Sequence, residues 1–374
     1  METFEKGTGI VCEYNPFHKG HAYQIKSVKE MGARFVVCAM SGDFTQRGEP
    51  AFQDKYVRAE NAVRNGADIV LEIPFPFSSM SAEGFAKAGI SVLENSGLCS
   101  SFAFGSECAD VNKLACVADI LDKDFHKQVL ELQKNNPNLG YALARERLVT
   151  ERLGEEFSDI LKNPNDILAV EYLKANKKLL PIAVKRTTPR GGYDENFVSS
   201  SYVRNNLFGE DGETARRGLP EDISLEGIYK DDSMFYRFLL LSFTLKTPEQ
   251  LEGIAEVQRG CEHSIVKNAR KASDYQELCR LLASKTLTDA KIRRMLLFSL
   301  LGVTKEMTSK PVCYTQVLAS SELGKKMLKK YSEDKSITVA SRISQIKKDE
   351  SAKKQYDFAR FAFEVLSKCR EQTL

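Results

Sequence analysis

The sequence of 374 residues has no tryptophan, only 4 histidines and no Cys-x-x-Cys pair among its 9 cysteines. Scattered single cysteines argue against a zinc site and against a disulfide framework, so we expect reduced thiols and no bound metal. No stretch approaches the roughly 20 apolar residues that a membrane-spanning helix needs. The first residues also lack the basic and then apolar pattern of a signal peptide. We therefore expect a cytoplasmic protein without membrane contact.

Two common phosphate-binding signatures are also missing. Neither a Gly-x-Gly-x-x-Gly fingerprint nor a Gly-Lys-Ser/Thr loop precedes the first predicted helix, which argues against a dehydrogenase and a P-loop ATPase. The net charge of +3 is too small to indicate nucleic-acid binding by itself. With 42% hydrophobic and 28% charged residues, the chain is typical of a globular protein and long enough for two domains.

Two of the few histidines lie close together after a short β-branched run. In IVCEYNPFHKGHAY, residues 10–23, Ile10 and Val11 end a predicted strand, and His18 and His21 start a predicted helix. The amides at such a helix start attract phosphate, and imidazoles there can stabilise charge on a leaving pyrophosphate. A helix cap or a buried histidine would explain one of the two, but not the pair. The element resembles the H-x-G-H signature of the nucleotidylyltransferase superfamily.

Further predicted strands bring polar residues to the same edge of the sheet. Residues 34–40 form a second strand that ends in the polar loop SGDFTQRGEPA, residues 41–51, a contact for substrate or nucleic acid unless it is only a solvated loop. Strands at 69–73 and 101–104 follow, the latter ending at Gly105, which lies against a nucleotide or simply forms a turn. Residues 181–187 form a further strand with Lys185 and Arg186 at its end, where a surface position would explain them equally well.

A serine-rich helix start closes this predicted domain. In FVSSSYVRNNL, residues 197–207, three serines precede Arg204 by about one helical turn. Amides, hydroxyls and a guanidinium there can together bind the β- and γ-phosphates of ATP. Capping alone would explain one serine. The segment resembles the I-S-S-T-x-x-R element that follows the last core strand in nucleotidylyltransferases.

Beyond about Arg216 the pattern becomes helical. Helices are predicted at 233–245, 248–255, 262–272, 275–284 and 289–301, after a linker rich in glycine and charge at 209–222. We therefore expect an α/β fold in two parts. A Rossmann-like domain with a parallel sheet occupies residues 1–208, and a mostly α-helical domain occupies residues 223–374. Its basic residues form an RNA-binding face or only solvated helix surfaces.

Six segments, taken in chain order, closely resemble one family, tRNA(Met) cytidine acetate ligase. They are EYNPFHKGH, SGDFTQRGEPA, FGSE, PNDILAVEYLKA, VKR and SSSYVR. The resemblance is dense over the first 205 or so residues and weaker beyond them. It implies an enzyme that joins acetate to ATP, forms acetyl-adenylate and pyrophosphate, and acetylates N4 of the wobble cytidine of elongator tRNA(Met). ATP is then the co-substrate, expected as its Mg²⁺ complex as in related adenylyltransferases. Because no dedicated carboxylate cluster is evident, the Mg²⁺ is expected to come with the substrate.

The resemblance and the residue patterns together yield a set of candidate site residues. The catalytic candidates are His18, His21, Ser200 and Arg204. The ATP-binding candidates are Ile10, Val11, Cys12, Glu13, Tyr14, Asn15, Pro16, Phe17, His18, Lys19, Gly20, His21, Ala22, Tyr23, Gly105, Asn165, Arg186 and Thr187. The tRNA-binding candidates are Lys285, Lys291, Arg293 and Arg294.

Two positions depart from the family pattern. Asp166 stands where the family usually has a second asparagine, and Lys285-Thr286-Leu287-Thr288 stands where it often has Lys-Arg-Tyr-Thr. The latter lacks an arginine and an aromatic ring that would pair and stack with RNA.

Three rival functions are a small-molecule adenylyltransferase of the pantetheine-phosphate or nicotinamide-nucleotide type, a class I aminoacyl-tRNA synthetase, and a non-catalytic RNA-binding relative. The synthetase is disfavoured because no convincing K-M-S-K-S segment is present.

Overall fold

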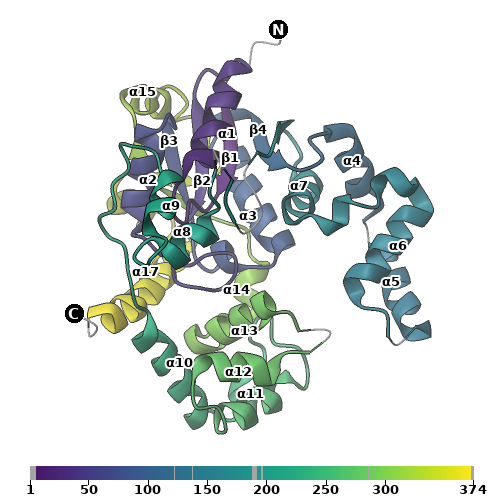
Figure 1. The fold of residues 1–374 in the computed structure, drawn as a ribbon. Helices are drawn as coiled ribbons and strands as arrows, with labels where there is room; N and C mark the ends of the chain where they lie inside the picture. The colour runs from purple at the N-terminus through teal and green to yellow at the C-terminus, as the bar shows by residue number, and fades with distance from the viewer. Residues whose placement is uncertain are drawn as a thin grey trace.

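The computed structural model describes residues 6–121, 123–136, 138–187, 192–194, 197–284 and 287–371. A seven-stranded sheet lies at its centre, in the order β5-β4-β1-β2-β3-β6-β7 (Figure 1). Five strands are parallel: β1 (Gly7–Cys12), β2 (Val36–Ser41), β3 (Ile69–Ile73), β4 (Cys99–Ser106) and β5 (Leu180–Lys185). Strands β5, β4 and β1 are neighbours and run in the same direction, so their carboxyl ends meet at one edge of the sheet.

Helices cover both faces of the sheet, so the central strands are apolar on both sides. On one face, Cys38 and Met40 of β2 pack with the residues of α1 (Lys19–Glu30) and α2 (Lys55–Arg64). On the other face, Val37 and Ala39 pack with α3 (Ala82–Asn95) and α7 (Pro164–Ala175). The short turn η1 (Phe77–Ser79) precedes α3. The strands predicted for this part and the helix predicted to start at His18 are confirmed, with ends that differ by a few residues.

The chain segment that connects β4 to β5 forms a group of helices that projects from the sheet (Figure 1). It consists of α4 (Val111–Ile120), α5 (Lys123–Asn135), α6 (Tyr141–Leu153) and the short turns η2 (Glu155–Phe157) and η3 (Ile160–Lys162). After β5 come α8 (Ser200–Asn206) and α9 (Gly212–Arg217), which lies inside the predicted linker. The linker region is therefore partly ordered as helix.

A helical block below the sheet consists of α10 (Ser233–Leu245), η4 (Pro248–Leu251), α11 (Cys261–Ala269), α12 (Tyr275–Leu282) and α13 (Asp289–Leu301) (Figure 1). The helix predicted at 248–255 is wrong beyond residue 251, since Gly253 adopts a φ of +77°. Phe44 and Phe75 from the sheet side enter the core of this block. Each buried phenylalanine contributes roughly 1.5–3 kcal/mol, so the block is anchored to the sheet.

The last part of the chain returns from the helical block to the sheet. After α14 (Lys305–Ser309), β6 (Tyr314–Ser320) pairs antiparallel with β3, and β7 (Thr338–Ala340) pairs with β6. Between and after them lie α15 (Glu322–Lys330), α16 (Ile343–Ile346) and α17 (Glu350–Glu371). The sequence reasoning missed both strands, so residues 223–374 are not simply a helical domain. Within the described residues, no helix is long and apolar enough to cross a membrane.

Candidate active site

The segment between β1 and α1 is held by a buried aromatic ring. Tyr14 has a φ of +48°, which is uncommon for a residue with a side chain. Its ring lies 4.9 Å from that of Phe17 and 4.8 Å from that of His21, measured between centroids. Such a backbone conformation costs on the order of 1–3 kcal/mol and persists only where the surroundings enforce it. The aromatic packing therefore fixes the entry of the chain into α1.

The two histidines of the H-x-G-H sequence bind the backbone of their own helix start. His18 is the N-cap of α1, and its Nδ1 accepts a hydrogen bond from Gly20 N–H at 3.0 Å. The Nδ1 atom of His21 accepts from His18 N–H at 3.2 Å, and the two rings stack with centroids 3.7 Å apart. Because each Nδ1 accepts, each neutral ring carries its proton on Nε2. The two Nε2–H groups remain as donors for a ligand.

Both imidazoles are neutral at physiological pH. Burial, together with the charges of Arg186 and Arg204, lowers the pKa of His18 to about 3. Burial also lowers the pKa of His21, and the neighbouring His18 and Arg186 add to the effect. The pair therefore offers a ligand oriented N–H dipoles rather than charge, and the positive charge beside it belongs to the arginines.

The ends of β4 and β5 bring a second group of residues to this edge. The Nδ2 amide of Asn165 donates to Glu107 Oε1 at 2.6 Å, and Arg186 Nε lies 3.7 Å from the same oxygen. A Cβ at Gly105 would lie 3.3 Å from Arg186 Cγ, so glycine leaves room for the arginine. Thr187 is exposed beside it. Sequence reasoning missed Glu107, although it lies within the FGSE segment; its Oε2 atom is buried and has no hydrogen-bond partner among the described residues.

Asp166, which replaces the usual asparagine, lies in the protein interior. Its carboxylate accepts hydrogen bonds from the hydroxyl of Ser106, from Cys108 N–H at 3.1 Å and from Asn163 Nδ2 at 3.2 Å. The side chain is fully buried. This departure from the family pattern therefore holds the turn after β4.

The helix α8 lies next to the histidine segment. Arg204 Nη1 donates to the carbonyl oxygen of Asn15 at 2.6 Å, which ties the predicted phosphate element to the end of β1. The N-cap is Ser199, whose hydroxyl accepts from Tyr202 N–H at 3.3 Å. Ser200 is thus the first helical residue, and its hydroxyl is not used for capping.

The polar loop of residues 41–51 connects this site to the helical block. Gln46 N–H donates to Glu13 Oε1 at 2.6 Å, and Glu49 forms an ion pair with Arg293 of α13. Below the loop, the fully buried Arg58 donates hydrogen bonds to four carbonyl oxygens, those of Glu13, Ser41, Gly42 and Gln53. The end of β1 and the loop after β2 are therefore held together by one guanidinium.

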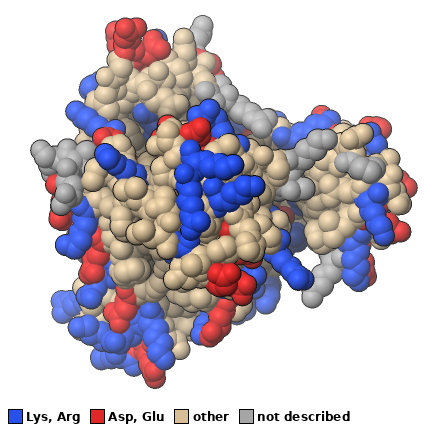
Figure 2. Space-filling view, turned by 90° about the horizontal axis from the view of Figure 1, so that it is seen from below, with Lys and Arg blue, Asp and Glu red and all other residues tan. Residues whose placement is uncertain are grey.

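The predicted tRNA-binding residues do not form one open basic cluster. Arg294 is only 7% exposed, and its Nη2 lies 3.4 Å from Glu256 Oε2, which corrects the expectation of a surface role. Arg293 is ion-paired with Glu49 and also with Asp289, at 2.8 Å. Lys291 is half-buried and makes no ion pair with the described residues. Lys285 lies outside the described residues. Viewed from the side of the helical block, lysine and arginine side chains nevertheless gather near the middle of the face (Figure 2).

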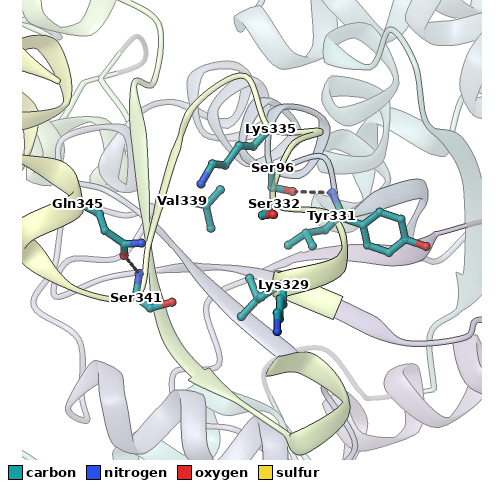
Figure 3. A pocket seen from close by; sticks show the side chains of 10 residues that line it. Ser96, Lys329, Tyr331, Ser332, Lys335, Val339, Ser341 and Gln345 are labelled. Atoms are coloured by element: carbon teal, nitrogen blue, oxygen red, sulfur yellow. Dashed lines mark hydrogen bonds between the residues drawn. The ribbon is translucent and has the colours of Figure 1, made fainter. Parts of the chain in front are cut away.

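A separate cavity of about 230 Å³ lies at the other edge of the sheet (Figure 3). Its lining includes Lys329, Tyr331 and Lys335, together with Leu98, which directly precedes β4. The histidine pair follows the end of β1, which is parallel to β4. The cavity is therefore remote from the histidines. Among the described residues, no three His, Cys, Asp or Glu side chains are grouped to hold a metal ion.

A parallel sheet with two stacked histidines after its first strand and arginines at the same edge defines a nucleotidyl transferase of the H-x-G-H class. The family model described as HIGH Nucleotidyl Transferase matches residues 5–373. The chain is 32% identical to the tRNA(Met) cytidine acetate ligase of Thermoanaerobacter pseudethanolicus, over 96% of this chain and 94% of the relative. It is 37% identical to the Thermotoga petrophila protein of the same name, over 84% of this chain and 82% of the relative.

Solved structures agree with these relatives. The Thermotoga maritima TmcAL structure bound with alpha-thio ATP has a TM-score of 0.88 and 30% identity, and covers 98% of this chain and 95% of that chain. The apo structure of the same protein has a TM-score of 0.89. The chain belongs to the tRNA(Met) cytidine acetate ligase family.

Proposed function

We propose that this protein activates acetate with ATP and transfers the acetyl group to N4 of the wobble cytidine of elongator tRNA(Met). The observation that carries this proposal is the stacked pair of neutral histidines with two free Nε2–H donors, flanked by Arg186 and Arg204. The names of the relatives and the alpha-thio ATP bound to the Thermotoga maritima structure support it.

In the first step an acetate oxygen attacks the α-phosphorus of ATP, and the bond from this phosphorus to the bridging oxygen of the β-phosphate breaks. The Nε2–H groups of His18 and His21 donate to the transferred phosphoryl group as its charge redistributes. Ser200 and Arg204 hold the departing pyrophosphate. Positioning and electrostatics supply most of the rate, because no covalent enzyme intermediate forms.

The nucleoside lies on the side of β4 and β5. Arg186 and Asn165 are already oriented by Glu107, and Gly105 and Thr187 complete this side. The remaining contacts come from residues 10–23, as predicted from the sequence. Magnesium enters with the triphosphate, which it binds in water as well.

In the second step the cytidine N4 amine attacks the acetyl carbonyl and releases one proton to solvent, and AMP leaves with the electron pair of the broken carbon–oxygen bond. An acyl-adenylate is activated enough to need no protein nucleophile, so none of the 9 cysteines is required. The acceptor base must then reach the α-phosphate region from outside, across the mouth of the ATP site.

The histidine role is tested by pyrophosphate exchange into ATP. We expect exchange that depends on acetate in the wild type and a loss of at least about 100-fold in His21→Ala, because one phosphate donor is removed. His126→Ala, which changes an exposed histidine on α5, is the matched control, and circular dichroism verifies folding. Full exchange in folded His21→Ala would refute the assignment. Exchange only with a phosphorylated metabolite would indicate the adenylyltransferase rival, and exchange only with an amino acid would indicate the synthetase.

The tRNA step is tested at Lys291. Since Arg293 and Arg294 are paired with carboxylates, charge reversal there would disrupt packing as well as RNA contacts. We expect Lys291→Glu to lower tRNA acetylation by roughly tenfold, through loss of one phosphate contact and added repulsion. Acetate-dependent exchange, measured in parallel, reports the first step. Equal tRNA acetylation by Lys291→Glu and wild type would remove this position from the RNA interface.

A further inference from the structure

Residue 47 lies in a short bridge between the ATP site and the helical block. On one side, Gln46 N–H is bound by Glu13 in the histidine segment, at 2.6 Å. On the other side, Gly48 lies so close to α13 that a Cβ there would be 2.6 Å from Arg294 N. With both neighbours of residue 47 held, its position at the junction is defined by the backbone.

Arg47 is exposed at this junction and makes no hydrogen bond or ion pair with the described residues. Two other guanidiniums are nearby. Burial lowers the pKa of Arg204 and of Arg293, and the nearby charge of Arg47 lowers both further. At Arg204 the negative charge of Glu13 raises the pKa and opposes this lowering. Arg204 is bound to the Asn15 carbonyl, and the Nε of Arg293 is buried without a hydrogen-bond partner among the described residues. Among the described residues, Arg293 is paired with Glu49 and Asp289 and Arg204 with the Asn15 carbonyl, whereas Arg47 has no partner of either kind.

We propose that Arg47 binds a backbone phosphate of the tRNA at the mouth of the ATP site and so positions the acceptor cytidine for acetyl transfer. This proposal rests on the proposed function, because it assumes that an RNA strand crosses this mouth. A phosphate anion is the chemistry that an exposed, unpaired guanidinium next to two others recognises. The same chemistry is offered by ATP. The RNA is favoured because Arg47 is the exposed member of the group, whereas Arg204 and Arg293 are half-buried.

The experiment compares Arg47→Ala, Arg47→Lys and Arg34→Ala in three assays. Arg34 is an exposed arginine two residues before β2, at the opposite edge of the sheet, and is the matched control. The assays are acetate-dependent pyrophosphate exchange, transfer of labelled acetate to an elongator tRNA(Met) transcript, and filter binding of that transcript over a range of salt concentrations.

For Arg47→Ala we expect the loss in transfer to exceed the loss in exchange by about tenfold, as one charge-assisted hydrogen bond would produce. The slope of log affinity against log salt should decrease by about 1, and Arg47→Lys should restore the slope. Equal losses in exchange and transfer, with a raised KM for ATP, would assign Arg47 to the triphosphate and overturn the proposal. A wild type that binds the transcript but lacks acetate-dependent exchange would refute the proposed function, while the salt slope would still decide whether Arg47 contacts RNA.

Discussion

At the scale of single residues, the backbone fixes which nitrogen of each imidazole in the candidate site carries the proton. Two backbone amides occupy the Nδ1 atoms of His18 and His21, and burial keeps both rings neutral. A neutral N–H donor does not lose its proton as the pH rises above neutrality. The proposed phosphate stabilisation therefore rests on fixed dipoles together with arginine charges that are constant over the whole working range.

A prediction about stability follows from the lowered pKa of His18. The pKa of His18 is about 3 in the folded protein and 6.5 for the ordinary group. Between pH 6.5 and about pH 3, the unfolded chain therefore binds a proton at His18 that the folded chain does not bind. Stability therefore decreases as the pH falls through this window, by up to about 1.4 kcal/mol per pH unit. His18→Asn retains a good N-cap and should show a weaker decrease. Urea midpoints at about pH 7.5 and about pH 5.5 measure it; an equal decrease in both proteins would contradict the prediction.

At the scale of elements, the 41–51 loop connects the catalytic edge to the helical block. Gly48 permits this because its φ of +77° and the closeness of α13 both exclude a side chain. The loop also contributes Phe44, whose ring lies 5.1 Å from Phe75 and 6.0 Å from Phe235 of α10. The loop predicted as a substrate contact is therefore also a structural connection.

Replacing Gly48 by alanine tests this connection. Gly302 has a similar φ of +73°, but no atom lies within 4 Å of the position of its Cβ, so Gly302→Ala is the matched control for backbone strain alone. We expect the control to lower the free energy of unfolding by about 1 kcal/mol. Gly48→Ala should cost a further 1–3 kcal/mol or so, because the loop must move away from α13. Urea denaturation measures both values, and equal losses would argue against tight docking of the loop.

At the scale of the whole molecule, the first and last strands of the chain, β1 and β7, belong to the same sheet. Strand β6 pairs with β3 through Ile69 with Ser320 and Val70 with Ala319. The hydroxyl of Thr315 donates to the carbonyl oxygen of Glu72 at 2.7 Å. At the end of α17, Arg370 is bound to Asp232, just before α10, at 2.7 Å. The sheet and the helical block therefore share their last elements.

We expect that residues 1–208 alone do not unfold cooperatively. Removing the rest exposes the edge of β3, a site of aggregation, and uncovers Phe44 and Phe75. Thermal unfolding followed by circular dichroism tests this. Co-expression with residues 209–374 is the control, and it should restore a cooperative transition. A sharp transition in the 1–208 fragment would show instead that the predicted domain boundary separates independent folding units.

The sequence by itself determined the five parallel strands, the helix start after the first of them and the H-x-G-H segment. These features depend on local patterns: short β-branched runs, helical spacing of apolar residues, and histidines placed directly after a strand. Gly105 and Arg186 could also be placed at one edge, because parallel strands end on the same side. The family followed from the order of these segments.

Only the tertiary structure decided the features that depend on distant partners. The partner of β6 lies about 250 residues earlier in the chain, so its short apolar pattern had no local signal of pairing. The neutrality of the histidines depends on burial under other elements. Likewise, the ion pairs of Arg293 and Arg294 become visible only when Glu49 and Glu256 meet α13. Charge in a sequence shows which residues are ionic, but burial and pairing decide which of them remain available to a ligand.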